Sequence, residues 1–172
     1  MTGTRIAYWT VFATTMAIHA AMVGGTLPAI AGDAAGLLPF DLRPRGYSVA
    51  EARAFLAALG DRGRALYLGP QHWLDLFYPA LLALVLIGAV RALIRPLWLQ
   101  IPLYLLAIGG MVADYLENAR VATLLSLRGP LPDALIEAAS RATQFKAGLT
   151  AVVMLAICAG LVRAGWKRWR TT

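Results

Sequence analysis

The sequence predicts an all-α, polytopic membrane protein, a bundle of four transmembrane helices with an extracytoplasmic helical cap. Of its 172 residues, 59% are hydrophobic and only 15% are charged, whereas soluble chains average about 45–50% and 25%. Four windows contain no Asp, Glu, Lys or Arg. The single cysteine excludes a disulfide framework and a cysteine-based zinc site. We therefore interpret residues 1–172 as a single membrane domain.

The first charge-free window covers residues 6–32. The apolar core of a cleaved signal peptide is only about 7–15 residues long. The window therefore predicts a retained span over about 6–30, with a cleaved signal as the alternative. The windows 76–90, 96–113 and 147–162 are shorter than the roughly 20 residues that a spanning helix needs.

These three spans must therefore extend past charged residues, and we predict them at about 71–91, 96–117 and 144–164. Because the charges at their outer ends then lie near or inside the apolar layer, they should face the bundle interior and pair.

The connection 31–70 is the longest segment between spans. Ser48 and Glu51 have the spacing of a capping box, which predicts an amphipathic helix over 49–59 that ends at Gly60. We expect this helix to lie on the outer membrane surface or over the mouth of the bundle. A second short helical turn should end at Gly69-Pro70.

Residues 118–143 are predicted to form a helical hairpin above the membrane. Gly129-Pro130 is a natural helix stop, and Pro132-Asp133 is a natural restart. The hairpin would thus join the third span directly to the fourth.

The positive charges indicate the orientation. With four spans, seven bases and no acid lie on the side of the two termini: Arg5, Arg91, Arg95, Arg163, Lys167, Arg168 and Arg170. The other side holds the remaining nine bases and all nine acids. Lys and Arg favour the cytoplasmic side, so we predict an integral protein of a bacterial cytoplasmic (inner) membrane with both termini in the cytoplasm. Topology explains the net charge of +7, and we expect membrane lipid rather than nucleic acid as the partner.

The outer ends of the last three spans form a predicted charged belt. A helix rises 1.5 Å per residue, so each charge can be placed by its distance along the helix from the arginine at the other end of its span. These distances are about 24 Å for Asp75, 28 Å for Asp114 and 26 Å for Lys146. Glu117 is about one turn further along the third span. We predict these four residues as the catalytic group of a shared site. The candidates for substrate binding beside them are His72, Tyr78, Asn118, Arg120 and Glu51.

Paired carboxylates in a poorly hydrated site can divide the roles of acid and base. We therefore expect a membrane-embedded enzyme or binding protein that acts on an apolar or amphipathic, lipid-like small molecule by acid–base chemistry. No cofactor and no metal is expected, although His72-x-x-Asp75 and Asp114-x-x-Glu117 leave a metal site as an alternative.

Other interpretations stay open. The belt could be a structural ion-pair network, and the chain an accessory or scaffold subunit of a larger membrane complex or oligomer. Buried carboxylates beside a lysine would also serve a small ion- or proton-coupled transporter. His19, in the middle of the first span, is interpreted as a neutral side chain that contacts a neighbouring helix.

Overall fold

A computed structural model describes residues 3–127 and 129–170, and within these ranges the chain is helical without strands. Four helical stretches are long and apolar enough to cross a membrane. The first combines α1 (Gly3–Ala21), the π-helical turn η1 (Met22–Thr26) and α2 (Leu27–Asp33). It runs without interruption through the window that the sequence predicts as the first span.

The second long helix differs from the sequence prediction at its start. We expected a stop at Gly69-Pro70, but α4 (Asp61–Leu66), η3 (Tyr67–Gln71) and α5 (His72–Leu93) form one continuous helix. The π-helical turn η3 contains Pro70. A π turn is wider than an α turn, so it accommodates the proline ring and its missing N–H without ending the helix.

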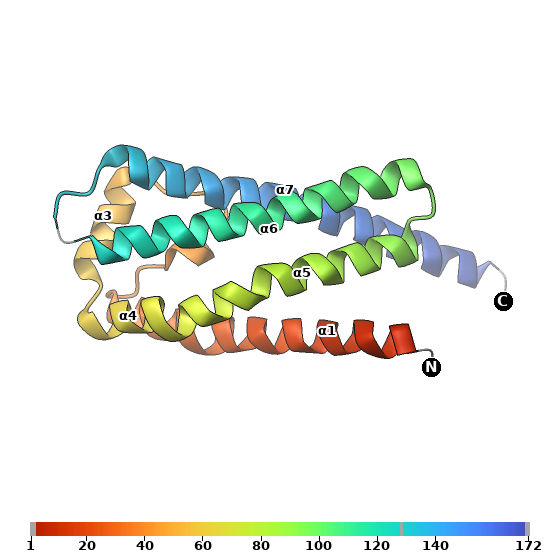
Figure 1. The fold of residues 1–172 in the computed structure, drawn as a ribbon, viewed down its shortest axis with the longest axis horizontal. Helices are drawn as coiled ribbons and strands as arrows, with labels where there is room; N and C mark the ends of the chain where they lie inside the picture. The colour runs from red at the N-terminus through yellow and green to blue at the C-terminus, as the bar shows by residue number, and fades with distance from the viewer. Residues whose placement is uncertain (1–2, 128, 171–172) are drawn as a thin grey trace.

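The last two long helices are α6 (Leu97–Ser126) and α7 (Asp133–Trp169). They continue well past the predicted spans, and they form the two arms of the predicted hairpin. α7 packs along α6 and also contacts α5, whereas α1 packs along α5. Figure 1 shows that α1 begins and α7 ends at the same end of the bundle, with α3 (Val49–Ala58) at the opposite end.

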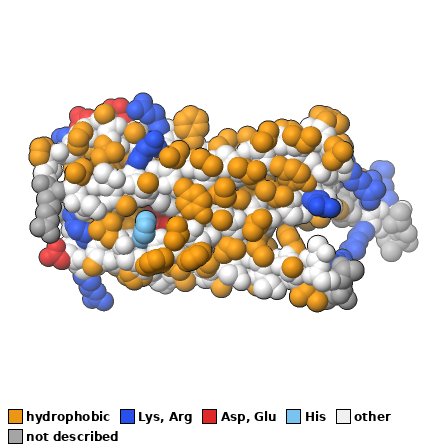
Figure 2. All heavy atoms as spheres, in the orientation of Figure 1, with side chains coloured by type: hydrophobic (Ala, Val, Ile, Leu, Met, Phe, Trp, Pro, Cys, Tyr) orange, Lys and Arg blue, Asp and Glu red, His pale blue; other side chains and the backbone are white. Residues whose placement is uncertain are grey.

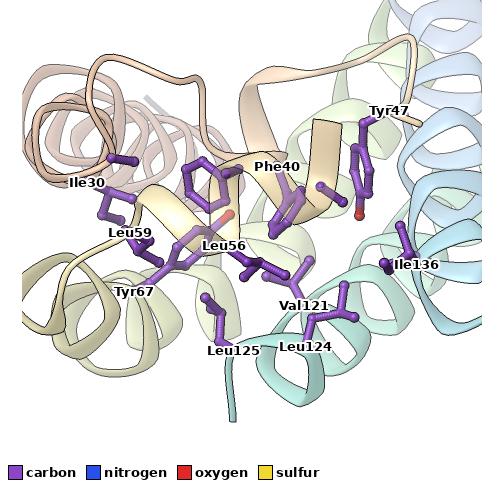
Figure 3. Packing of buried hydrophobic residues seen from close by; sticks show 14 residues of the cluster. Ile30, Phe40, Tyr47, Leu56, Leu59, Tyr67, Val121, Leu124, Leu125 and Ile136 are labelled. Atoms are coloured by element: carbon purple, nitrogen blue, oxygen red, sulfur yellow. The ribbon is translucent and has the colours of Figure 1, made fainter. Parts of the chain in front are cut away.

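The segment between α2 and α4 folds as a cap over that opposite end. Its residues Phe40 and Phe55 pack with Tyr67 of η3, Leu124 of α6 and Ile136 of α7 in one apolar cluster (Figure 3). The ring centroids of Phe40 and Phe55 are 4.9 Å apart. At the start of α3, Ser48 and Glu51 form the predicted capping box.

Hydrogen bonds attach the cap to α7. The Tyr47 amide donates to Ser140 Oγ at 2.8 Å, and Gln144 Nε2 donates to the Arg45 carbonyl at 2.9 Å. Between them, Gly46 has φ +80°, and a Cβ there would collide with the Ser140 and Gln144 side chains. Only glycine therefore fits this close approach without displacing its neighbours.

The molecule exposes many large apolar side chains and buries several polar ones, although most of its buried residues are apolar. Buried side chains include Asp75, Asp114, Glu117 and Asn118, while residues such as Leu155 are largely exposed. On the face shown in Figure 2, apolar side chains cover most of the middle of the molecule, and charged side chains gather toward its two ends. An apolar exterior suits a lipid environment.

Candidate acid-lined cavity

The structure brings three of the four predicted catalytic residues into direct contact. Lys146 Nζ on α7 lies 3.1 Å from Asp114 Oδ1 on α6 and forms a second ion pair with Glu117 Oε2 one turn further along α6. Lys146 thus bridges two carboxylates on the same face of one helix. Asp75, the fourth predicted residue, comes from α5.

A cavity of about 370 Å³ opens beside this ion pair. It lies between α1 and α7, two helices that both pack on α5. Its charged lining consists of Asp41, Asp75, Asp114 and Lys146. The remaining wall is mainly apolar: Met22, Val23, Leu27, Leu42, Leu82, Ala147, Ala151 and Met154. The site therefore joins an apolar channel to a group of ionisable side chains, which is the combination that orients a small molecule.

Asp75 is positioned by a neutral side chain. Gln71 Nε2 lies 3.1 Å and 3.0 Å from the two Asp75 carboxylate oxygens, and Thr26 Oγ1 donates to Gln71 Oε1. Thr26 ends the π turn η1 and Gln71 ends the π turn η3. The two π turns thus contact each other next to Asp75, and single-turn π segments are often found at functional sites.

Asn118 compensates for a proline in α5. Pro79 has no N–H, so the Asp75 carbonyl lacks its normal donor four residues later. Asn118 Nδ2 donates to this carbonyl at 3.3 Å. Asn118, a predicted substrate-binding residue, therefore holds α6 against α5 directly behind the Asp75 side chain.

Glu117 lies behind the cavity wall. It is 1% exposed, and it accepts a hydrogen bond from Thr143 Oγ1 in addition to its ion pair with Lys146. The buried Tyr47 hydroxyl has no hydrogen-bond partner among the described residues. Burial raises the pKa of this phenol well above its usual value, and the Glu117 carboxylate raises it further.

The sequence analysis missed Asp41. It lies in the short 3₁₀ turn η2 (Phe40–Leu42) of the cap, and its Oδ2 accepts a hydrogen bond from the Tyr67 hydroxyl. The depth of the other acids followed from the rise of a helix, but Asp41 belongs to an irregular segment between two prolines. Its only sequence signal was an acid in an otherwise apolar stretch.

The histidine of the first helix also lines the cavity. The rings of His19 and Tyr78 are stacked, with centroids 5.6 Å apart and planes inclined by 22°. His19 thus contacts the neighbouring helix through its ring. Tyr78, a predicted substrate-binding residue, reaches the cavity through this pair.

The other predicted binding residues lie elsewhere. His72 lines a much smaller hollow of about 10 Å³ between α5 and α6, together with Asp75 and Asn118. Arg120 NH1 donates to the Ala138 carbonyl at 3.3 Å on α7. Glu51 is exposed, and its carboxylate is held by Ser48 in the capping box. The structure therefore brings neither Arg120 nor Glu51 to the cavity.

No group of three His, Cys, Asp or Glu side chains within residues 3–127 and 129–170 is arranged to hold a metal ion. In comparisons with known proteins, no family model, no curated protein and no solved structure matches this chain. Function must therefore be inferred from the geometry of the cavity.

Proposed function

We propose that this protein is an integral membrane protein that binds an apolar or amphipathic, lipid-like small molecule and acts on it by acid–base chemistry. The observation that carries the proposal is the cavity of about 370 Å³, which joins an apolar wall to Asp75, Asp114 and Lys146. Small-molecule sites typically enclose about 300–1,000 Å³. A purely structural ion-pair network would need no such space beside it.

The proposed location is a bacterial cytoplasmic membrane, with both termini in the cytoplasm and the cap outside. Four apolar helices and many exposed large apolar side chains support the membrane assignment. The seven bases without an acid at the end where α1 begins and α7 ends support the orientation. The cavity would then lie near the outer boundary of the bilayer.

The proposed chemistry divides the carboxylates into two groups. Asp114 shares the Lys146 ammonium with Glu117, so it is suited to remain ionised and accept a proton. Asp75 is only 7% exposed and forms no ion pair with a described Lys or Arg, so when no ligand is bound it is suited to hold a proton and donate it. Two acids in different environments are the usual basis of acid–base pairs in one site.

A second candidate is an accessory subunit of a larger membrane complex. It is favoured by the closed environment of Glu117, which is fully buried and paired with Lys146 and Thr143. Buried ion pairs of this kind can fix the register of packed helices. For such a subunit the cavity would hold only a packing lipid or a neighbouring protein segment.

The test compares two alanines of α7. Ala151 lines the cavity, whereas Ala159 is exposed on the same helix and is absent from the lining. We expect a small molecule to co-purify with the wild type and with Ala159→Phe, and to be lost from Ala151→Phe. Mass spectrometry of extracts from equal amounts of folded protein would measure it. A compound retained equally by all three proteins would contradict binding in this cavity.

A further inference from the structure

Acidic side chains outnumber basic ones in the lining of the cavity. Three carboxylates, those of Asp41, Asp75 and Asp114, line it together with one ammonium, that of Lys146. That ammonium is already shared between Asp114 and the buried Glu117. No Lys or Arg of the described residues forms an ion pair with Asp41 or Asp75. Within the described part of the chain, these two acids therefore have no cation in direct contact.

Asp75 is the clearer case of a buried acid without an ion-pair partner. It is only 7% exposed, and its neighbour Gln71 donates an amide N–H to each oxygen but carries no charge. Asp41 similarly receives a neutral hydrogen bond, from the Tyr67 hydroxyl. Burying a carboxylate without a counter-charge is costly. Asp75 is therefore suited to hold a proton when no ligand is bound, whereas a positively charged ligand beside it would remove the cost of ionising it and an anionic ligand would increase that cost.

The rest of the cavity fits the apolar part of such a ligand. Leu82 and Met154 lie on opposing helices, and the stacked rings of His19 and Tyr78 add an aromatic surface. Aromatic faces attract cations as well as apolar groups. Because α7 packs on α6 and α5 while α1 packs on α5, a molecule in the apolar layer can reach the space between α1 and α7 from the side.

We propose that the ligand is a cationic amphiphile: its protonated amine lies at Asp41 and Asp75, and its hydrocarbon chain lies along the apolar wall. This inference depends on the proposed function, because it names the class of molecule that the same cavity takes. It goes further by assigning the two acids outside the Lys146 ion pair to ligand recognition.

The experiment uses three probes with the same hydrocarbon chain: dodecylamine, dodecanol and dodecanoate. The full chain is reconstituted in phosphatidylcholine nanodiscs, whose lack of net charge removes electrostatic attraction of the amine and leaves partition through the hydrocarbon chain that all three probes share. Saturable binding is measured against empty nanodiscs by isothermal titration near pH 7, where the amine is protonated. We expect dodecylamine to bind at least tenfold more tightly than dodecanol, and dodecanoate to bind least.

Four variants locate the binding. We expect Asp75→Asn and Asp41→Asn each to weaken dodecylamine binding about tenfold or more while leaving dodecanol binding unchanged. Ala151→Phe should abolish binding of both, whereas Ala159→Phe should resemble the wild type. A thermal melt of each variant confirms that it is folded. If Asp75→Asn does not fold, Asp41→Asn, which lies in the cap, gives the same test.

The outcomes separate the two proposals. Equal binding of dodecylamine and dodecanol, both abolished by Ala151→Phe, would overturn the cationic class but keep a cavity for apolar molecules. Tightest binding of dodecanoate would also overturn it, and would point to Lys146 as the recognising group. Unchanged amine binding in both Asn variants would overturn the roles of Asp41 and Asp75. If Ala151→Phe binds every probe like the wild type, the cavity is not the site and the proposed function fails as well.

Discussion

Lys146 contacts two carboxylates that differ in their surroundings, and this difference separates a structural role from a functional one. Glu117 is enclosed behind the cavity wall, whereas Asp114 lines the cavity. Breaking a buried ion pair costs about 3–5 kcal/mol, and Asp114 remains as the second partner of Lys146 when the Glu117 charge is removed. We therefore expect Glu117→Gln to lower the free energy of unfolding by about 3 kcal/mol.

Asp114→Asn is the matched comparison, because it removes a charge from the same lysine on the cavity side. Lys146 keeps one carboxylate partner in either variant, but Asp114 lines the cavity whereas Glu117 is 1% exposed, so the melting temperature should fall less in Asp114→Asn than in Glu117→Gln. Ligand binding or activity should fall by about a hundredfold or more if Asp114 is the base. Thermal melts in detergent, run beside the binding assay, would measure both. A large loss of stability with unchanged binding in Asp114→Asn would favour the accessory-subunit role.

Gly46 provides a test of how the cap is attached to α7. At φ +80° a side chain is strained, and a Cβ would also meet Ser140 and Gln144. We expect Gly46→Ala to lower stability by about 1–3 kcal/mol. Gly148→Ala, in an open position of the same helix α7, is the control and should cause no loss. Equal melting temperatures for the two variants would contradict the close approach.

Glu51 links the stability of α3 to pH. Its hydrogen bonds from the Ser48 backbone and side chain hold the pKa of Glu51 below its ordinary value of 4.5. A carboxyl group whose pKa is lowered by folding contributes stability above the unfolded pKa, and the contribution disappears as the pH falls through the folded pKa. The melting temperatures of wild type and Glu51→Gln should therefore differ near pH 6, and the difference should shrink as the pH falls below the ordinary pKa of 4.5. Glu137→Gln, on an exposed face of α7, controls for the loss of one surface acid.

At the level of elements, the long apolar windows predicted the helices more reliably than local helix-stop signals such as Gly-Pro did. The charge-free windows located all four long helices because a long apolar segment without charged residues is typical of a membrane-spanning helix. Gly69-Pro70 was interpreted as a stop, yet it lies inside the π turn η3. Local preference gave the wrong answer there because Gln71, one residue later, is held by Thr26 and Asp75. The contact with Asp75 is local, but Thr26 lies 45 residues away in the sequence, and no local pattern contains that contact.

The contact between α5 and α6 allows a double-mutant test. Asn118→Leu would leave the buried Asp75 carbonyl without a donor, at a cost of about 1–3 kcal/mol. Pro79→Ala restores an N–H four residues after Asp75, so the same Asn118→Leu change should cost clearly less in that background. Chemical unfolding of the four proteins would measure the coupling. Additive losses would show that Asn118 and Pro79 act independently.

The position of Asp41 could not be predicted from the arrangement of the helices. The depth of a residue in a helix follows from 1.5 Å per residue, so the sequence alone assigns Asp75, Asp114 and Lys146 to one level. Asp41 reaches the same cavity from an irregular turn of the cap. Its position depends on how Phe40 packs with Phe55 and Tyr47, and that packing is set by the tertiary fold.

For the whole molecule, the orientation in the membrane is the main prediction to test. In a Cys158→Ala background, single cysteines at Ala57 on α3 and at Arg170 beyond α7 mark the two ends of the bundle. We expect a thiol reagent that cannot cross the membrane to label the Ala57→Cys protein in intact cells and the Arg170→Cys protein only after lysis. The reverse pattern would invert the orientation and place the cavity near the cytoplasm.

The uneven distribution of basic residues also has an electrical consequence. Seven of them lie at the end where α1 begins and α7 ends, while the nine bases and nine acids elsewhere cancel. Moving one elementary charge across about 100 mV takes about 2.3 kcal/mol, so inverting the whole chain in an energised membrane would take about 16 kcal/mol of electrical work. The membrane voltage would thus hold the inserted protein in its original orientation. Dissipating that voltage during synthesis is the condition under which wrongly inserted copies should accumulate.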